Sequence, residues 1–235
     1  PNSGLGASSS LTTNFVNVIS HLQGKKTTPD KIAIQAYKIG HDILKWGIGK
    51  QDEYASAFGG LNLYKFTKNK VIVKPINLKK STAKELQDNS LLFRLGDREH
   101  SKGILQSQIK SINQSNKTTI LALHKAKELA IEMYDSLKEN DLTKFSDILN
   151  RGWEAKRDYT KGVSNKRIEM VSKKATENGA QALKVTGAGG GGHFFIYANP
   201  SKHNSIIKSL KKLGVNNVDF KYQNQGSRVF EINNL

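Results

Sequence analysis

The sequence predicts an α+β fold in which neighbouring strands pair antiparallel. Segments with strand composition and segments with helical periodicity are interspersed along the 235 residues, without the regular alternation that a doubly wound parallel sheet requires. Two strand segments, 61–66 and 70–76, follow each other closely, as in a hairpin. Helical periodicity then dominates from 101 to 178. The length is sufficient for one sizeable domain or two small ones.

Apolar residues that recur at helical spacing define the expected helices. Gly24 is expected to end the first helix, and Pro29 suits a first-turn position of the second. A loop with a short helix is expected before the Gly59-Gly60 turn. With these two included, the expected long helices cover 11–22, 29–45, 101–113, 118–139, 142–158, 164–178 and 201–213.

Short runs rich in β-branched and aromatic residues define the expected strands. They lie at 61–66, 70–76, 89–96, 182–185, 193–198, 217–222 and 227–232. A soft boundary between two parts of the chain is expected at 82–88.

The chain carries a formal net charge of +17, from 37 Lys and Arg against 20 Asp and Glu. Such an excess is typical of proteins with an anionic partner, such as nucleic acid, a membrane surface or phosphorylated small molecules. The lysines are spread along the chain and are not interleaved with aromatic residues, so we expect no nucleic-acid partner. No apolar run approaches the roughly 18–20 residues of a membrane span, so we expect no membrane partner. The absence of cysteine excludes disulfides and thiolate metal sites and is compatible with a cytoplasmic location.

The opening stretch, PNSGLGASSS, combines features of a phosphate-binding loop. Gly4 and Gly6 let backbone N–H groups turn inward around an anion, and the N-terminus of the following helix favours negative charge. The serines at 8–10 can donate to phosphate or face Mg²⁺. The stretch lacks the Lys-Ser/Thr of a Walker A loop and the third glycine of a dinucleotide fingerprint. An ordinary loop with a serine helix cap is the alternative.

An acidic residue lies close to a lysine in the segment GKQDE at 49–53. Asp52 could accept a hydroxyl proton as a phosphoryl group is transferred, and a nearby cation would keep its carboxylate ionised. The alternative is a solvated helix start at which Asp52 only supplies favourable charge.

Five glycines lie within six residues in the segment GAGGGG at 187–192. The segment formally satisfies G-x-G-x-x-G, but a dinucleotide fingerprint must open a helix, whereas the residues at 194–197 are typical of a strand. A hairpin turn needs fewer glycines than this. We therefore expect a close backbone approach to a ligand or to another loop.

Taken in this order, the three segments resemble the GHMP family of small-molecule kinases, which includes galactokinases, homoserine kinases and mevalonate kinases. PNSGLGASSS is similar to the family's second, phosphate-binding motif, and KVTGAGGGG is similar to its third. Within the family, GIGKQDEYASAFGGLNLYKF, LHKAKELA, NRGWEAKRDYTKGVSN and GSRV resemble the bacterial D-glycero-D-manno-heptose 7-phosphate kinases. The likeness covers essentially the whole chain.

The resemblance implies a two-domain fold and an activity. Residues 1–85 would be the remainder of the N-terminal, ATP-binding domain, and 86–235 a ferredoxin-like C-terminal domain with a helical insertion. The family's first motif, with roughly the first third of the enzyme, is missing, so we expect a truncated N-terminus. The implied reaction transfers the γ-phosphate of ATP to the anomeric hydroxyl of heptose 7-phosphate. Its 1,7-bisphosphate product would feed nucleotide-activated heptose for surface glycans.

The resemblance also implies roles for individual residues, with ATP and Mg²⁺ as cofactors. Asp52 would take the proton of the sugar hydroxyl, and Ser8 would face Mg²⁺. The residues expected to bind the ATP phosphates are Gly4, Leu5, Gly6, Ala7, Ser8 and Ser9. Those expected to shape the site near the transferred phosphate and the sugar are Gly187, Ala188, Gly189, Gly190 and Gly191.

One departure from the family pattern concerns the metal. The family places a magnesium-binding glutamate in the helix before the aspartate loop, where this chain has Gly40-His41-Asp42. Asp42 is the candidate substitute. Two alternatives stay open: a catalytically impaired homologue that binds nucleotide or sugar phosphate, and a GHMP kinase for another sugar. A basic nucleic-acid-binding module on a related scaffold is the weakest rival, and the oligomeric state, including a homodimer, is left open.

Overall fold

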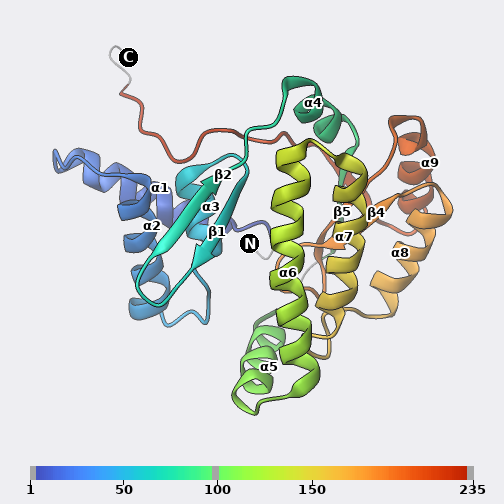
Figure 1. Ribbon diagram of the computed structural model, residues 1–235, viewed down its shortest axis with the longest axis horizontal. Coiled ribbons are helices and arrows are strands. Elements are labelled where there is room, and N and C mark those ends of the chain that lie inside the picture. Colours follow the sequence, from blue (N-terminus) through green and yellow to red (C-terminus); the bar gives the residue numbers. More distant parts are fainter. Residues whose placement is uncertain (1–3, 97–100, 232–235) are drawn as a thin grey trace. The chain divides into compact units, whose positions relative to one another are not determined.

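The computed structural model describes residues 4–96 and 101–231, which form two compact units (Figure 1). The first unit holds Gly6–Pro75 and the C-terminal segment from Tyr222 onward. The second unit holds Ile76–Lys221 together with Gly4 and Leu5. The expected domain division at residue 85 stays a prediction. None of the described helices is both long and apolar enough to cross a bilayer.

The first unit packs three helices and a hairpin around a small core. Its elements are α1 (Ala7–Leu22), α2 (Pro29–Lys38), the π-helical turn η1 (Ile39–Ile43), α3 (Gln51–Phe58), β1 (Asn62–Phe66) and β2 (Val71–Pro75). The core consists of Val16, Ile32, Ala33, Ala36, Tyr54 and Ala57. The short helix and the hairpin are confirmed, and β1 pairs with β2 antiparallel. The single helix expected over 29–45 is wrong in its second part, because the α-helix ends at Lys38 and a π-helical turn continues it.

Helix α1 begins four positions earlier than the apolar pattern indicated. Its N-cap is Gly6, which has a left-handed backbone with φ of +71°, and no side chain caps this end. The alternative of a serine cap is therefore wrong, because the serines at 8–10 lie inside the first turns of the helix. The apolar pattern starts only at Leu11 because these earlier helical positions carry small polar residues.

The C-terminal segment of the first unit forms no strand over 227–231, so the strand expected there is wrong within the described residues. The segment runs instead against the end of α3. The Gly60 N–H donates to the Gln223 carbonyl at 2.9 Å. A Cβ atom on Gly59 would lie 2.2 Å from the backbone nitrogen of Gly226, so both glycines are needed for this approach. Backbone contacts with α3 have replaced the expected strand pairing.

The second unit has the chain order β-α-β-β-α-β of a ferredoxin-like sheet, with extra helices in its first crossover. Its elements are α4 (Lys80–Asp88), β3 (Ser90–Gly96), α5 (Ser101–Asn113), α6 (Lys117–Glu139), α7 (Leu142–Arg157), α8 (Lys166–Glu177), β4 (Ala182–Val185), β5 (Gly192–Tyr197), α9 (Pro200–Lys211) and β6 (Asn216–Val218). The strand order is β4-β5-β3-β6, and all neighbours are antiparallel. The expected α+β class and ferredoxin-like topology are confirmed. Helix α4 was not expected, and β6 is shorter than the strand expected over 217–222.

Alternating residues of the central strands fill the core of this unit. Phe93 of β3 lies opposite Phe194 of β5, and both side chains are fully buried. Ile196 follows at the next inward position of β5. Helices α8 and α9 contribute Val171 and Leu210 to the same cluster. The alternation of inward-facing residues along HFFIYA therefore results from this packing.

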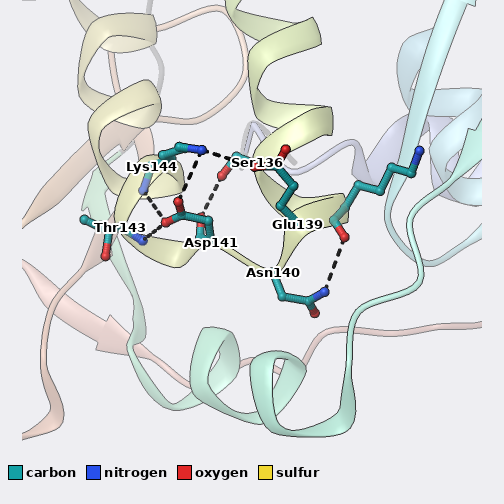
Figure 2. A network of polar contacts seen from close by, with 7 residues as sticks. Ser136, Glu139, Asn140, Asp141, Thr143 and Lys144 are labelled. Atoms are coloured by element: carbon teal, nitrogen blue, oxygen red, sulfur yellow. Dashed lines mark hydrogen bonds and ion pairs between the residues drawn. The ribbon is translucent and has the colours of Figure 1, made fainter.

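The turn between α6 and α7 is held by local polar contacts (Figure 2). Asn140 ends α6 with φ of +61°, and Asp141 caps α7 by accepting the N–H groups of Thr143 at 3.1 Å and Lys144 at 2.9 Å. Ser136 Oγ donates to the Asp141 carbonyl at 2.7 Å. The two hydrogen bonds to the Asp141 carboxylate lower its pKa, and the bond from Lys144 N–H has the larger effect. The turn therefore fixes how two long antiparallel helices meet.

Candidate functional site

The N-terminus of α1 has the geometry of an anion-binding site. Gly4 and Gly6 both have left-handed backbones, with φ of +74° and +71°. The first intrahelical bond runs from Ser10 N–H to the Gly6 carbonyl, so the N–H groups at 6–9 have no acceptor within the helix. The first turn contains no acidic residue. Five other described helices are capped by side chains, namely Thr28, Asn116, Asp141, Asn165 and Asn199, whereas α3 and α4 lack a side-chain cap as α1 does.

Asp52 lies beside this helix end. A Cβ atom built on Gly6 would lie 3.5 Å from the Cβ, Cγ and Oδ2 atoms of Asp52, so the carboxylate lies next to the space that a side chain at position 6 would occupy. Asp52 is the second residue of α3 and is exposed. The structure thus brings together two residues that the sequence assigned to phosphate binding and to proton transfer. The neighbouring cation, Lys50, has its Nζ 5.2 Å from the centre of the Tyr37 ring.

Ser9 and Glu53 form a buried hydrogen bond next to that contact. Ser9 Oγ donates to Glu53 Oε1 at 2.8 Å, and the two residues are only 7% and 1% exposed. Burial raises the pKa of Glu53, while the hydrogen bond from Ser9 opposes this rise. The Ser9 side chain therefore faces Glu53, and its backbone N–H is the group left for a phosphate. The sequence did not single out Glu53, because its partner lies 44 positions away.

Ser8 and Asp42 are the candidate metal ligands. Both are exposed, and together they offer a hydroxyl and a carboxylate oxygen, the hard donors that Mg²⁺ prefers. Asp42 Oδ1 lies 2.8 Å from His41 Nδ1. This hydrogen bond is the main reason why the pKa of Asp42 is lowered. These donor types are compatible with Mg²⁺, which would take its other ligands from phosphate and water. Within 4–96 and 101–231 there is no cluster of three or more His, Asp or Glu suited to hold an ion alone.

Gly40 occupies the place where the family has its glutamate, and it is buried against two apolar side chains. A Cβ atom there would lie 2.8 Å from Ile48 Cδ1 and 3.3 Å from Trp46 Cε3. A larger residue at position 40 would therefore have to displace Ile48.

The glycine-rich loop after β4 lies in the second unit. Gly189 and Gly190 have φ of +96° and +76°. A Cβ atom on Gly189 would lie 2.6 Å from the Val163 carbonyl oxygen, and one on Gly190 would lie 2.5 Å from Ile104 Cδ1. Gly190 N–H also donates to the Val163 carbonyl at 2.9 Å. At these two positions the expected close approach is therefore to other parts of the same chain, the loop at Val163 and the Ile104 side chain of α5, while Gly187 is exposed.

Lys156 supports the base of this loop and was not foreseen. It is 8% exposed, and its Nζ donates to the Val185 carbonyl at 3.0 Å and to the Gly187 carbonyl. The available signal was its position on α7, three residues after the buried Trp153 on the apolar stripe of that helix. A lysine at such a position indicates a buried ammonium that needs carbonyl or carboxylate partners.

Comparison with known proteins agrees with this arrangement. Residues 133–216 match the family described as GHMP kinases C terminal. The chain is 32% identical to a D-glycero-alpha-D-manno-heptose 7-phosphate kinase of Campylobacter jejuni, covering 98% of this chain and 68% of that protein. It is 26% identical to a mevalonate kinase of Thermococcus sibiricus, covering 97% and 66%.

The same similarity is found among solved structures. The crystal structure of a D-glycero-D-manno-heptose 1-phosphate kinase from Bacteroides thetaiotaomicron superposes with a TM-score of 0.76 at 26% identity, covering 98% of this chain and 65% of that one. The chain thus spans about two thirds of the length of these relatives. With the phosphate-loop and aspartate motifs in contact and this similarity along nearly its whole length, the chain belongs to the GHMP kinase family.

Proposed function

We propose that this protein is an ATP-dependent kinase that phosphorylates the anomeric hydroxyl of D-glycero-D-manno-heptose 7-phosphate, acting in the cytoplasm where ATP is available. The observation that carries the kinase assignment is the closeness of Asp52 to Gly6, since Asp52 atoms lie 3.5 Å from a Cβ built on that glycine. It supports the proposal because a proton acceptor and a phosphate-binding helix start have to lie near each other for phosphoryl transfer. The heptose assignment is supported by the name of the Campylobacter jejuni relative, which is 32% identical.

The start of α1 would bind the phosphates of ATP. Backbone N–H groups at 6–9 point out of the first turn, and the helix dipole favours the negative charge of a polyphosphate. Ser8 is exposed and can add its hydroxyl, whereas the Ser9 hydroxyl is engaged with Glu53. Gly4 and Leu5 would extend the same loop. The exposed Gly187 and the half-buried Ala188 are the part of the second loop available to the sugar phosphate.

Asp52 would act as the proton acceptor during transfer. The sugar oxygen forms a bond to the γ-phosphorus while the bond between that phosphorus and the β,γ-bridging oxygen breaks, and ADP leaves with the electron pair. The hydroxyl proton passes to a carboxylate oxygen of Asp52. Such a reaction needs mainly positioning and charge neutralisation from the protein. Mg²⁺, held by Ser8 and Asp42, would neutralise charge on the phosphates.

The test is an ATP-consumption assay with three acceptors: heptose 7-phosphate, galactose and mevalonate. We expect turnover with the heptose phosphate alone, and Asp52→Asn should lower kcat by about 10²–10⁴-fold. Asp88→Asn is the control, because Asp88 lies on α4 in an exposed ion pair with Lys84. Turnover of galactose or mevalonate instead would refute the substrate assignment.

An impaired homologue is the second candidate. Position 40 favours it because glycine supplies no metal ligand there, and a longer residue would have to displace Ile48 Cδ1. Such a protein would bind a nonhydrolysable ATP analogue but transfer no phosphate to any of the three acceptors, and Asp52→Asn would change nothing. ATP turnover that depends on Mg²⁺ and on Asp52 would exclude it.

A further inference from the structure

Two contacts, not one, join the start of α1 to the start of α3. Gly6 lies near the exposed Asp52. Further along the two helices, Ser9 and Glu53 form a buried hydrogen-bonded pair. Each residue of the second pair is the third residue of its helix. The two pairs therefore form a short double attachment between the ends that carry the proposed phosphate site and the proposed proton acceptor.

The directions of the side chains follow from helix geometry. Successive residues of an α-helix point about 100° apart, so a residue that faces the neighbouring helix leaves the one before it facing elsewhere. Glu53 is 1% exposed, whereas Asp52 before it is exposed. Ser9 is 7% exposed, whereas Ser8 before it is exposed. Turning Ser9 and Glu53 toward each other thus fixes the outward direction of both proposed functional residues.

The buried carboxyl is hydrogen-bonded by the Ser9 hydroxyl and by the Glu53 backbone. Among the described residues, Glu53 Oε2 has no hydrogen-bond partner, and Oε1 accepts from Ser9. Burial raises the pKa of Glu53, and the charge of Asp52 adds to this rise. Removal of the Ser9 hydroxyl would leave a buried carboxyl without this donor, which favours rearrangement of the helix start.

We propose that Glu53 is a positioning residue for phosphoryl transfer: by accepting the Ser9 hydroxyl, it holds the start of α3, and with it Asp52, against the start of α1. The inference rests on the proposed role of Asp52 as proton acceptor. Glu53 itself contacts neither nucleotide nor sugar in this role. It acts through the placement of the residue before it.

The test compares Ser9→Ala, Glu53→Ala, Glu53→Gln and the double Ala variant in steady-state kinetics with ATP and heptose 7-phosphate. Because a misplacement of about 1 Å can cost about 10²-fold, we expect each single Ala variant to lower kcat by about 10–100-fold. The KM for ATP should change by less than about threefold, because the backbone N–H groups of α1 stay in place. Glu53→Gln keeps the acceptor oxygen and should retain kcat within about threefold. The double variant should be no slower than either single one, because both remove the same bond.

A matched control separates positioning from loss of stability. Ser172 is also 7% exposed and donates to a carbonyl, that of Ile168, within α8 of the second unit. Ser172→Ala should lower the melting temperature as Ser9→Ala does, but leave kcat unchanged. A kcat of Glu53→Ala equal to that of the active wild type, or multiplicative losses in the double variant, would overturn this inference and leave the proposed function intact. A wild-type protein that phosphorylates no sugar would overturn both.

Discussion

Gly189 is the position at which the packing of the glycine-rich loop can be tested most directly. Its φ of +96° is unfavourable for any residue with a side chain. A Cβ atom there would lie 2.6 Å from the oxygen and 2.9 Å from the Cα atom of Val163, both backbone atoms that no rotamer change can move. Gly189→Ala must therefore separate the loop from the segment that contains Val163.

The magnitude follows from two costs. A side chain in a sparsely populated backbone region costs about 1–3 kcal/mol. The separation also lengthens or breaks the 2.9 Å hydrogen bond from Gly190 N–H to the Val163 carbonyl, whose net contribution is about 0.5–1.5 kcal/mol. We expect Gly189→Ala to lower the free energy of unfolding of the second unit by about 2–4 kcal/mol.

Alanine substitutions at two other glycines of the same unit show how much of the expected cost comes from backbone strain and how much from the contact with Val163. Gly214 has φ of +70° and, within 4 Å of its built Cβ, meets only the tip of Arg167 at 4.0 Å. Gly214→Ala should therefore cost only the strain, about 1–2 kcal/mol. Gly103 lies in α5 and meets nothing within 4 Å. Gly103→Ala should be neutral or stabilise by up to about 1 kcal/mol.

The assay is urea unfolding followed by tryptophan fluorescence. Trp153 is 2% exposed in the core of the second unit, and Trp46, in the first unit, is 38% exposed. A Trp46→Phe background lets Trp153 alone report on the second unit. Equal losses in Gly189→Ala and Gly214→Ala would refute the reasoning, because the contact with Val163 would then contribute nothing beyond backbone strain.

The remaining predictions concern three polar groups. Lys156→Met removes a buried donor from the carbonyls of Val185 and Gly187 and should cost about 1–3 kcal/mol in the same urea titration; an unchanged midpoint would contradict the assigned contacts. Asp141→Ala removes the cap of α7 and should cost about 0.5–2 kcal/mol in thermal unfolding followed by circular dichroism, with no change if water caps the helix equally well. Because the folded pKa of Glu53 is raised above the ordinary glutamate value of 4.5, the stabilisation that Glu53 contributes is complete below that value and is lost as pH rises through the folded pKa. Glu53→Gln should therefore gain stability relative to wild type as pH rises from about 4 to 8, and a constant difference would show that Glu53 is not buried in its neutral form.

Much of the fold could be predicted because it rests on local periodicity. The long helices α5 to α8 have apolar residues at helical spacing, and β3 and β5 have alternating inward residues. Helix α4 was not predicted, because its nine residues are mostly polar and only Thr82 and Leu86 are buried, so no apolar periodicity marks it. The segment after Ser227 has the alternation of a strand, but Phe230 in it is 71% exposed. Its backbone contacts with α3 override strand propensity, which depends on a sheet partner.

The candidate site likewise contains residues that local sequence predicts and residues that only the tertiary packing reveals. Gly6 and Asp52 could be found because each belongs to a short motif whose chemistry is visible in a few neighbouring residues. The bond between Ser9 and Glu53 could not, because neither residue differs locally from an ordinary solvated serine or glutamate. Only the packing of α1 on α3 buries them together. The same holds for Lys156, which becomes a loop support only when β4 lies against α7.

The packing at Gly40 shows how a position that looks like a lost ligand can have a structural cause. The Leu44 N–H donates to the Ile39 carbonyl at 2.9 Å, closing the π-helical turn, and the Trp46 N–H donates back to the Gly40 carbonyl at 2.9 Å. The chain thus folds back so that Trp46 and Ile48 cover Gly40. A side chain at this position would have to displace Ile48 Cδ1, which lies 2.8 Å from a built Cβ atom. If a carboxylate from this region holds the metal, it has to come from Asp42, which the same turn leaves exposed.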